Sequence, residues 1–166
     1  MPRKNKKLPR HLLVIRTSAM GDVAMLPHAL RALKEAYPEV KVTVATKSLF
    51  HPFFEGLDVG FLDIETRRTH RGIRGAIRFA REAAELKIDA VADMHNVLRS
   101  KMVRAALHLR GIPVSVIHKG RIEKYMRLGR GSEGVKPLKH TVIRYCDVFR
   151  RLGFDFPDPR PAEKRP

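Results

Sequence analysis

The chain has 166 residues, of which 43% are hydrophobic, and this length and composition fit one globular domain and exclude wholesale disorder. Its 34 lysines and arginines outnumber 17 acidic residues, and the net charge of +17 favours anionic partners such as nucleic acid, anionic lipid head groups, or phosphorylated sugars and nucleotides. A single cysteine excludes an internal disulfide, and no apolar run reaches the roughly 18 residues of a membrane span. These features predict a cytoplasmic protein without a targeting signal.

The first part of the chain alternates strand and helix patterns. The unbroken apolar run at 11–16 predicts a strand that is buried on both faces. A helix with leucines at helical spacing follows and ends at Pro38, and Pro27 places the start, or a restart, of its regular part. A second strand is predicted at 41–47, and a short helix or loop at 48–57.

The middle of the chain continues the same alternation. A third strand is predicted at 59–65, an amphipathic surface helix at 69–87, a fourth strand at 88–95 and a further helix at 97–111. The apolar face predicted for the surface helix comprises Ile73, Ile77, Ala80 and Ala84. Its opposite face carries arginine and glutamate, so we expect that face to contact solvent.

The last part holds one strand, one basic loop and one helix. The strand is predicted at 112–118, the glycine-punctuated loop at 119–137 and the helix at 138–153. The buried stripe of this helix comprises Val142, Tyr145, Val148, Phe149 and Leu152. Cys146 lies in the same helix, where we expect a buried small hydrophobic residue rather than a nucleophile.

Five strands separated by helices predict repeated right-handed βαβ units. The expected fold is therefore α/β, with a Rossmann-like, doubly wound and mostly parallel five-stranded sheet. We divide the chain into a basic tail at 1–10, the Rossmann-like domain at 11–154, and a proline-rich tail or interdomain linker at 155–166. Ligands of such sheets bind outside the carboxyl ends of the strands, so the loops after the first, fourth and fifth strands are the candidate functional segments.

The loop after the first strand has the sequence RTSAMGD. Thr17 and Ser18 offer hydroxyls, and Gly21 allows a close approach of the backbone to a ligand. Asp22 then stands at a helix start, either as a first-turn acid stabilised by the helix dipole or as a general base for an acceptor hydroxyl. The loop matches neither the P-loop nor the dinucleotide fingerprint.

The two other loops carry hydrogen-bonding and basic groups. After the fourth strand, His95 and Asn96 lie in the loop and Arg99 in the first turn of the next helix, a set that suits sugar hydroxyls and carboxylates. His95 is either such a ligand-binding residue or an ordinary loop histidine, and no second His or Cys at ligand spacing supports a metal site. The run after the fifth strand is either a solvated surface or an anion pocket. Its basic residues are Lys119, Arg121, Lys124, Arg127 and Arg130.

Three stretches of the chain follow a recognisable pattern. In "LLVIRTSAMGDVAMLPHALRALKEAYP" an apolar strand is followed by Arg, two small residues, Gly-Asp, an apolar trio, Pro and a leucine-spaced helix. "IDAVADMHNVLRSK" has a strand, Asp, a polar pair, a basic residue and Ser, and "KHTVIRYCDVFRRLGF" forms a closing helix. Together they resemble the family 9 glycosyltransferases, the heptosyltransferase family of lipopolysaccharide biosynthesis. The resemblance runs from about Leu12 to Phe154.

The resemblance implies one half of a GT-B architecture, in which two Rossmann-like domains face each other. The N-terminal half would hold the acceptor, and a second domain, absent from this chain, would hold the nucleotide-sugar donor, commonly ADP-heptose. Transfer would invert the anomeric carbon without a metal or other cofactor, and Asp22 falls on the proposed catalytic base. The residues expected to bind substrate are Thr17, Ser18, Met20, Gly21, His95, Asn96, Arg99, Lys119, Arg121 and Lys124. His95-Asn96 stands where many members carry Gln-Gly.

The implied partners are a nucleotide-sugar donor and an anionic glycolipid or core-oligosaccharide acceptor. We also expect peripheral contact with the anionic inner face of the inner membrane, and a dimer formed through an exposed interdomain face is a further expectation. The isolated chain is predicted to be an incomplete or inactive transferase. Two alternatives stay open: a basic Rossmann-like nucleic-acid-binding module, although no specific nucleic acid is expected, and a non-catalytic nucleotide-binding domain.

Overall fold

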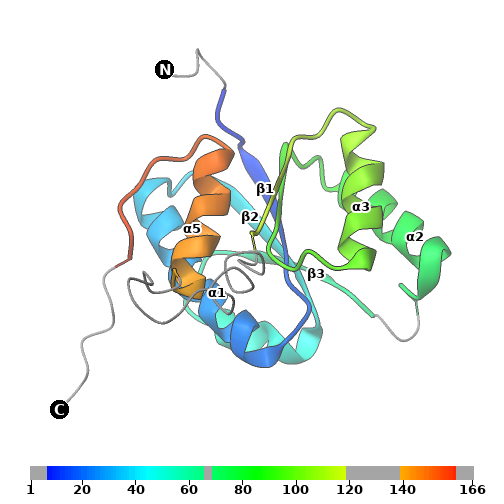
Figure 1. Ribbon diagram of the computed structural model, residues 1–166, viewed down its shortest axis with the longest axis horizontal. Coiled ribbons are helices and arrows are strands. Elements are labelled where there is room, and N and C mark those ends of the chain that lie inside the picture. The colour runs from blue at the N-terminus through cyan, green and yellow to red at the C-terminus, as the bar shows by residue number, and fades with distance from the viewer. Residues whose placement is uncertain (1–6, 66–68, 119–138, 160–166) are drawn as a thin grey trace, which may run out of the picture.

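The computed structural model describes residues 7–65, 69–118 and 139–159 (Figure 1). Five parallel strands form one sheet in the order β3-β2-β1-β4-β5. The strands are β1 (His11–Ile15), β2 (Lys41–Thr46), β3 (Gly60–Asp63), β4 (Ala90–Asp93) and β5 (Val114–Val116). Each lies inside its predicted range, and the predicted α/β, Rossmann-like fold is confirmed.

The strand order places the topological switch point between β1 and β4. The chain leaves β1 toward β2 and β3, then returns to pair β4 against the other side of β1. Ile15 and Asp93, the last residues of β1 and β4, are partners in this pairing. The loops that follow these two strands therefore leave the sheet side by side, at the edge where ligands bind in such folds.

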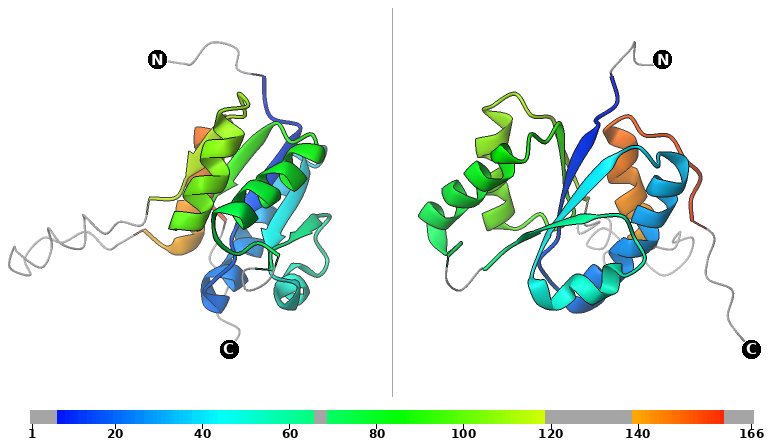
Figure 2. Two further views of the ribbon diagram at one scale, coloured as in Figure 1. Left: turned by 90° about the vertical axis from the view of Figure 1, so that its right-hand side faces the viewer. Right: turned by 180° about the vertical axis from the view of Figure 1, so that it is seen from behind.

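Helices cover both faces of the sheet (Figures 1 and 2). One face packs against α1 (Met20–Ala36), η1 (Ser48–Phe54) and α5 (Thr141–Arg151), and the other against α2 (Gly72–Glu85) and α3 (Leu98–His108). Alternate residues of β1 serve the two cores, with Leu12 and Val14 on the first face and Leu13 and Ile15 on the second. The lack of polar alternation in this strand follows from burial on both faces.

Helix α1 begins at Met20, so the prediction of a regular start near Pro27 is wrong. Pro27 lies inside the helix and is buried. An interior proline removes one helical hydrogen bond and costs about 3 kcal/mol. Val23 and Leu26, in the turns before it, are fully buried, and each such side chain contributes about 1.5–3 kcal/mol. Their burial offsets the cost of the proline, which explains why the helix extends through it.

Helix α2 is amphipathic, but it buries only part of the predicted face: Ala80 is buried and Ala84 packs against the core, whereas the two isoleucines face solvent. Ile73 and Ile77 are 68% and 53% exposed. The buried residues are Gly75, Ala76, Phe79, Ala80 and Ala83. Gly75 sets this rotation, because a Cβ at this position would lie 2.2 Å from the carbonyl carbon of His70. Only a residue without a Cβ allows such a contact, and Phe79 supplies the bulk that fills the core beside it.

Helix α5 buries the predicted stripe. Val142, Tyr145, Val148, Phe149 and Leu152 are all buried, as is Cys146. The segment after this helix also packs against the domain. The hydroxyl of Tyr37 donates to the carbonyl of Asp155 and accepts from its amide, each at 2.9 Å, and Phe156 is 5% exposed.

Candidate functional site

A pocket of about 330 Å³ opens at the carboxyl edge of the sheet, between the β1 and β4 loops and the α2–α3 layer. The β1 loop contributes Thr17 and Ser18, the β4 loop contributes His95, and Lys47 follows β2. Apolar side chains complete the wall, among them Ile15, Ile64, Phe79 and Val103. Among the described residues no acidic side chain lines this pocket. The pocket therefore offers hydroxyls, imidazole and positive charge to a small polar ligand.

The structure brings together three of the predicted substrate-binding residues. The hydroxyl of Ser18 lies 3.5 Å from Nε2 of His95, at the outer limit of a hydrogen bond. Thr17 and His95 are 9% and 8% exposed, so both are largely enclosed. Ser18 and His95 are 77 positions apart in sequence. They meet because β1 and β4 are adjacent parallel strands.

Asp22 lies in the first turn of α1, where a buried arginine holds it. Arg16 donates through Nη1 to the carbonyl of Met94 and through Nη2 to Oδ2 of Asp22. The Arg16 side chain is 8% exposed, whereas that of Asp22 is 44% exposed. No described residue donates a hydrogen bond to Oδ1 of Asp22. One carboxylate oxygen is thus fixed by Arg16, the other has no donor among the described residues, and the side chain as a whole is nearly half exposed.

Tyr145 of α5 secures the backbone of the same turn. Its hydroxyl donates to the carbonyl of Asp22 at 3.0 Å. Burial raises the pKa of Tyr145 to about 12, so the hydroxyl stays protonated and keeps donating. The pocket loop ends at Ser18, and Asp22 lies one helical turn further along the chain. Asp22 itself is not part of the pocket wall.

Asp93 shapes the loop after β4. It is fully buried, and its Oδ1 accepts from the backbone amides of His95 at 2.9 Å and Asn96 at 2.8 Å. Its Oδ2 accepts from Arg104 at 3.2 Å. The Asn96 side chain donates to the carbonyl of Ile117 and accepts from Arg104, both at 3.3 Å. Asn96 is thus used within the loop and does not line the pocket.

The remaining predicted residues fall into three groups. Met20 is 61% exposed and, with Gly21, begins α1 on the solvent side without lining the pocket. Arg99 lies in the first turn of α3, as predicted. Lys119, Arg121 and Lys124 lie outside the described residues, so their predicted role is untested.

Sequence reasoning missed three polar residues of the pocket, Lys47, His70 and Ser100. His70 is 4% exposed, and its Nδ1 accepts from the amide of Glu65 at 3.1 Å. Nε2 therefore carries the proton and donates to Glu82 at 2.9 Å. Burial by itself would raise the pKa of Glu82, but hydrogen bonds from Arg78 and His70 hold it below its usual value. In the sequence, only Gly75 hints at the position of His70. Its close contact with the His70 backbone can be recognised only in the folded structure.

No group of three or more His, Cys, Asp or Glu side chains is placed to hold a metal ion within the part of the chain that the structure describes. The site thus consists of two adjoining parts. One is the polar pocket beside α2 and α3, and the other is the Arg16–Asp22–Tyr145 cluster beside α1 and α5.

Comparisons with known proteins find solved structures with a similar fold. No protein-family model and no curated protein matches the chain. The solved structure of a glycosyl transferase family 9 protein from Veillonella parvula covers 87% of the chain with a TM-score of 0.64 and 17% identity. E. coli heptosyltransferase WaaC with ADP covers 89% with a TM-score of 0.59 and 22% identity, and E. coli ADP-heptose lps heptosyltransferase II covers 94% with 0.57 and 20%.

The chain matches only part of each of these solved structures. The chain spans 42%, 49% and 44% of these three structures, which is under half of their length. At these identities the likeness establishes the fold. The chain is similar in structure, over most of its length, to family 9 glycosyltransferases, and its Rossmann-like fold is that of about half of a GT-B enzyme.

Proposed function

We propose that the chain is the acceptor-binding half of an inverting glycosyltransferase, with Asp22 as general base. The transferred group would be a heptose-type sugar from ADP-heptose, and the acceptor a lipopolysaccharide core glycan. The observation that carries this proposal is the partly exposed Asp22 carboxylate at the carboxyl edge of the sheet, which buried Arg16 orients through Oδ2 while Oδ1 has no donor among the described residues. The sequence motif around Asp22 and the fold shared with E. coli heptosyltransferases support it.

The proposed step is a single displacement. An acceptor hydroxyl approaches Oδ1 of Asp22, which takes its proton as the oxygen attacks the anomeric carbon of the donor sugar. The bond from that carbon to the diphosphate breaks on the opposite face, and its electron pair leaves with ADP. The attack from behind inverts the anomeric configuration. Arg16 is a positioning residue here, because its hydrogen bond fixes the plane of the carboxylate.

The ion pair with Arg16 needs to be compatible with this role. An acid whose two oxygens were both enclosed by cations could not accept a proton from an incoming alcohol. Asp22 uses only Oδ2 in the pair, and its side chain is 44% exposed. When Asp22 takes a proton, the buried guanidinium keeps its hydrogen bond to the carbonyl of Met94, so it is not left without a polar partner.

The polar pocket suits the acceptor better than the donor. Its volume of about 330 Å³ is at the small end of ligand pockets, comparable to one or two sugar rings. Thr17, Ser18 and His95 can exchange hydrogen bonds with sugar hydroxyls, and Lys47 complements a phosphate or carboxylate. The donor would bind to a second domain, so this chain alone would be a poor catalyst.

Turnover in the full-length protein tests the base. Asp22→Asn should lower kcat by about 10²–10⁴-fold while leaving acceptor affinity unchanged, because general-base catalysis is removed without a change in shape. The variant should also unfold at a lower urea concentration, because buried Arg16 loses its carboxylate partner, so kcat is measured where the variant is fully folded. Asp63→Asn is the matched control. Asp63 is the last residue of β3, at the same edge of the sheet, and like Asp22 it is partly exposed, at 52%, and paired with a basic side chain, His51. Its replacement should leave kcat unaltered. Near-normal kcat for Asp22→Asn would defeat the assignment.

Binding to the 166-residue chain tests the acceptor pocket separately. Titration with a phosphorylated, deacylated core oligosaccharide should give saturable binding that Thr17→Val and His95→Gln weaken and Asp22→Asn does not. Saturable binding of ADP-heptose without binding of the oligosaccharide would favour a nucleotide-binding domain instead. Binding of unrelated oligonucleotides with equal affinity for every sequence would reflect only the net charge.

A further inference from the structure

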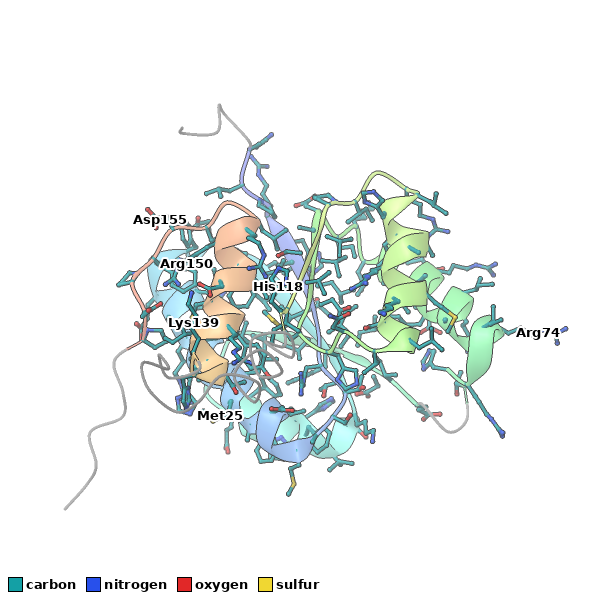
Figure 3. All side chains as sticks on the ribbon, in the orientation of Figure 1. Met25, Arg74, His118, Lys139, Arg150 and Asp155 are labelled. Carbon is teal, nitrogen blue, oxygen red and sulfur yellow. The ribbon has the colours of Figure 1, made fainter. Side chains whose placement is uncertain are left out.

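The outward face of α2 carries large apolar side chains. Ile73 and Ile77, one turn apart, are 68% and 53% exposed, and Arg74 and Arg81 beside them are also exposed. Arg74 projects away from the body of the molecule (Figure 3). Neither arginine pairs with an acidic side chain of the described residues. We call these four residues the isoleucine–arginine face.

This face is not a displaced part of the core. The inner side of α2 is already filled by Phe79 and by alanines, and Gly75 contacts the His70 backbone. Turning the helix to bury Ile73 and Ile77 would expose Phe79 and break that contact. The fold therefore leaves both isoleucines in water, where they contribute little to its stability.

One further exposed apolar side chain, that of Leu98, lies at the start of the neighbouring helix α3. Leu98, the first residue of α3, is 74% exposed and lines the mouth of the polar pocket. Gly75 and Ala76 of α2 line the same pocket. The pocket therefore adjoins the first turns of both α2 and α3, close in the chain to Ile73 and Arg74 and beside Leu98.

We propose that the isoleucine–arginine face, with Leu98, docks on an anionic phospholipid surface and turns the pocket toward that surface. Isoleucine side chains enter the acyl boundary while arginines bind lipid phosphates, the combination found in interfacial helices. A nucleic acid would use the arginines but gain nothing from exposed isoleucines. Contact would be at the surface, since within the described ranges no helix is long and apolar enough to cross a bilayer. The inference is independent of the proposed transferase activity.

Vesicle co-sedimentation tests the face directly. The chain should bind phosphatidylcholine vesicles only when phosphatidylglycerol is added. Arg74→Gln/Arg81→Gln should lower the partition coefficient about 25-fold at low salt, at about fivefold per arginine, and less at high salt. Ile73→Ser/Ile77→Ser should lower it about tenfold at either salt concentration.

Two matched controls separate the face from general charge and apolarity. Arg31→Gln/Lys41→Gln removes the same charge from exposed positions elsewhere. Leu109→Ser removes the large apolar side chain that is most exposed among the described residues, at 87%, directly after the far end of α3. Both should change vesicle binding less than about twofold. Losses equal to those of the face variants would overturn the proposal, as would absence of binding to anionic vesicles.

Fluorescence gives an independent readout, because the chain has no tryptophan. A single Ile77→Trp reporter should shift to shorter wavelength on anionic vesicles and be quenched by brominated lipid, and Leu109→Trp should do neither. Equal responses at both positions would refute a defined docking face. Binding of RNA that depends on the arginines and not on the isoleucines, without vesicle binding, would assign the face to nucleic acid instead.

Discussion

Replacement of Gly75 tests the packing that rotates α2 and forms one wall of the pocket. A Cβ on this residue would lie 2.2, 2.6 and 2.7 Å from the carbonyl carbon, Cα and carbonyl oxygen of His70, where ordinary contacts are 3.4–4 Å. All three atoms belong to the backbone, so no rotamer change relieves the overlap. The Gly75→Ala variant must separate α2 from the segment before it by more than 1 Å.

The expected loss of stability follows from three contributions. Overpacking of a rigid site costs about 1–3 kcal/mol, and backbone overlap places Gly75 at the upper end. Separation also weakens the hydrogen bond from the Glu65 amide to His70, at about 1 kcal/mol. Alanine returns about 1 kcal/mol through its higher helix propensity. The net destabilisation is about 2–3 kcal/mol, which lowers Tm by about 4–12 °C in a domain of this size.

Urea unfolding followed by far-UV circular dichroism measures this loss. Gly21→Ala is the matched control, because no atom lies within 4 Å of a Cβ on Gly21 and this residue also sits near the start of a helix. That variant should be unchanged or stabilised by up to about 1 kcal/mol. If Gly75→Ala unfolds at the same urea concentration as Gly21→Ala, the close contact does not exist and the orientation of α2 is incorrect.

Further outcomes follow from three buried side chains, Tyr145, Cys146 and Asp93. Tyr145→Phe should destabilise the chain by about 1–2 kcal/mol, because the carbonyl of Asp22 loses its donor. Wild-type stability should also fall between pH 10 and about 12, since unfolded Tyr145 ionises first, and urea titrations of the Phe variant should lack this component. Cys146 is buried with its pKa raised to about 11, so a thiol reagent at neutral pH should label it only as fast as the chain opens. Asp93→Asn should cost about 2–3 kcal/mol in urea unfolding, because Arg104 loses a buried carboxylate, and a wild-type midpoint would contradict the role of Asp93 in the loop.

Much of the fold could be predicted from local pattern. The apolar run of β1 and the stripe on α5 are properties of consecutive residues, and the observed elements bury them as predicted. The approach of Ser18 to His95 was also predictable, because carboxyl ends of adjacent parallel strands share one edge. The position of Asp22 in a first helical turn was also predictable, because the helix pattern begins directly after the loop that follows the first strand.

Other features depend on contacts between distant segments. Periodicity assigned Ile73 and Ile77 to the apolar face of α2, but the approach of Gly75 to His70 turns them to solvent. The bond from Arg16 to the carbonyl of Met94, across 78 positions, joins residues that no local pattern connects. The sequence by itself determined the order and type of the elements, since these depend on short-range periodicity and turn chemistry. Only the tertiary structure decided which face each helix buries and which polar atoms meet, because those depend on how side chains from separate elements fill the same space.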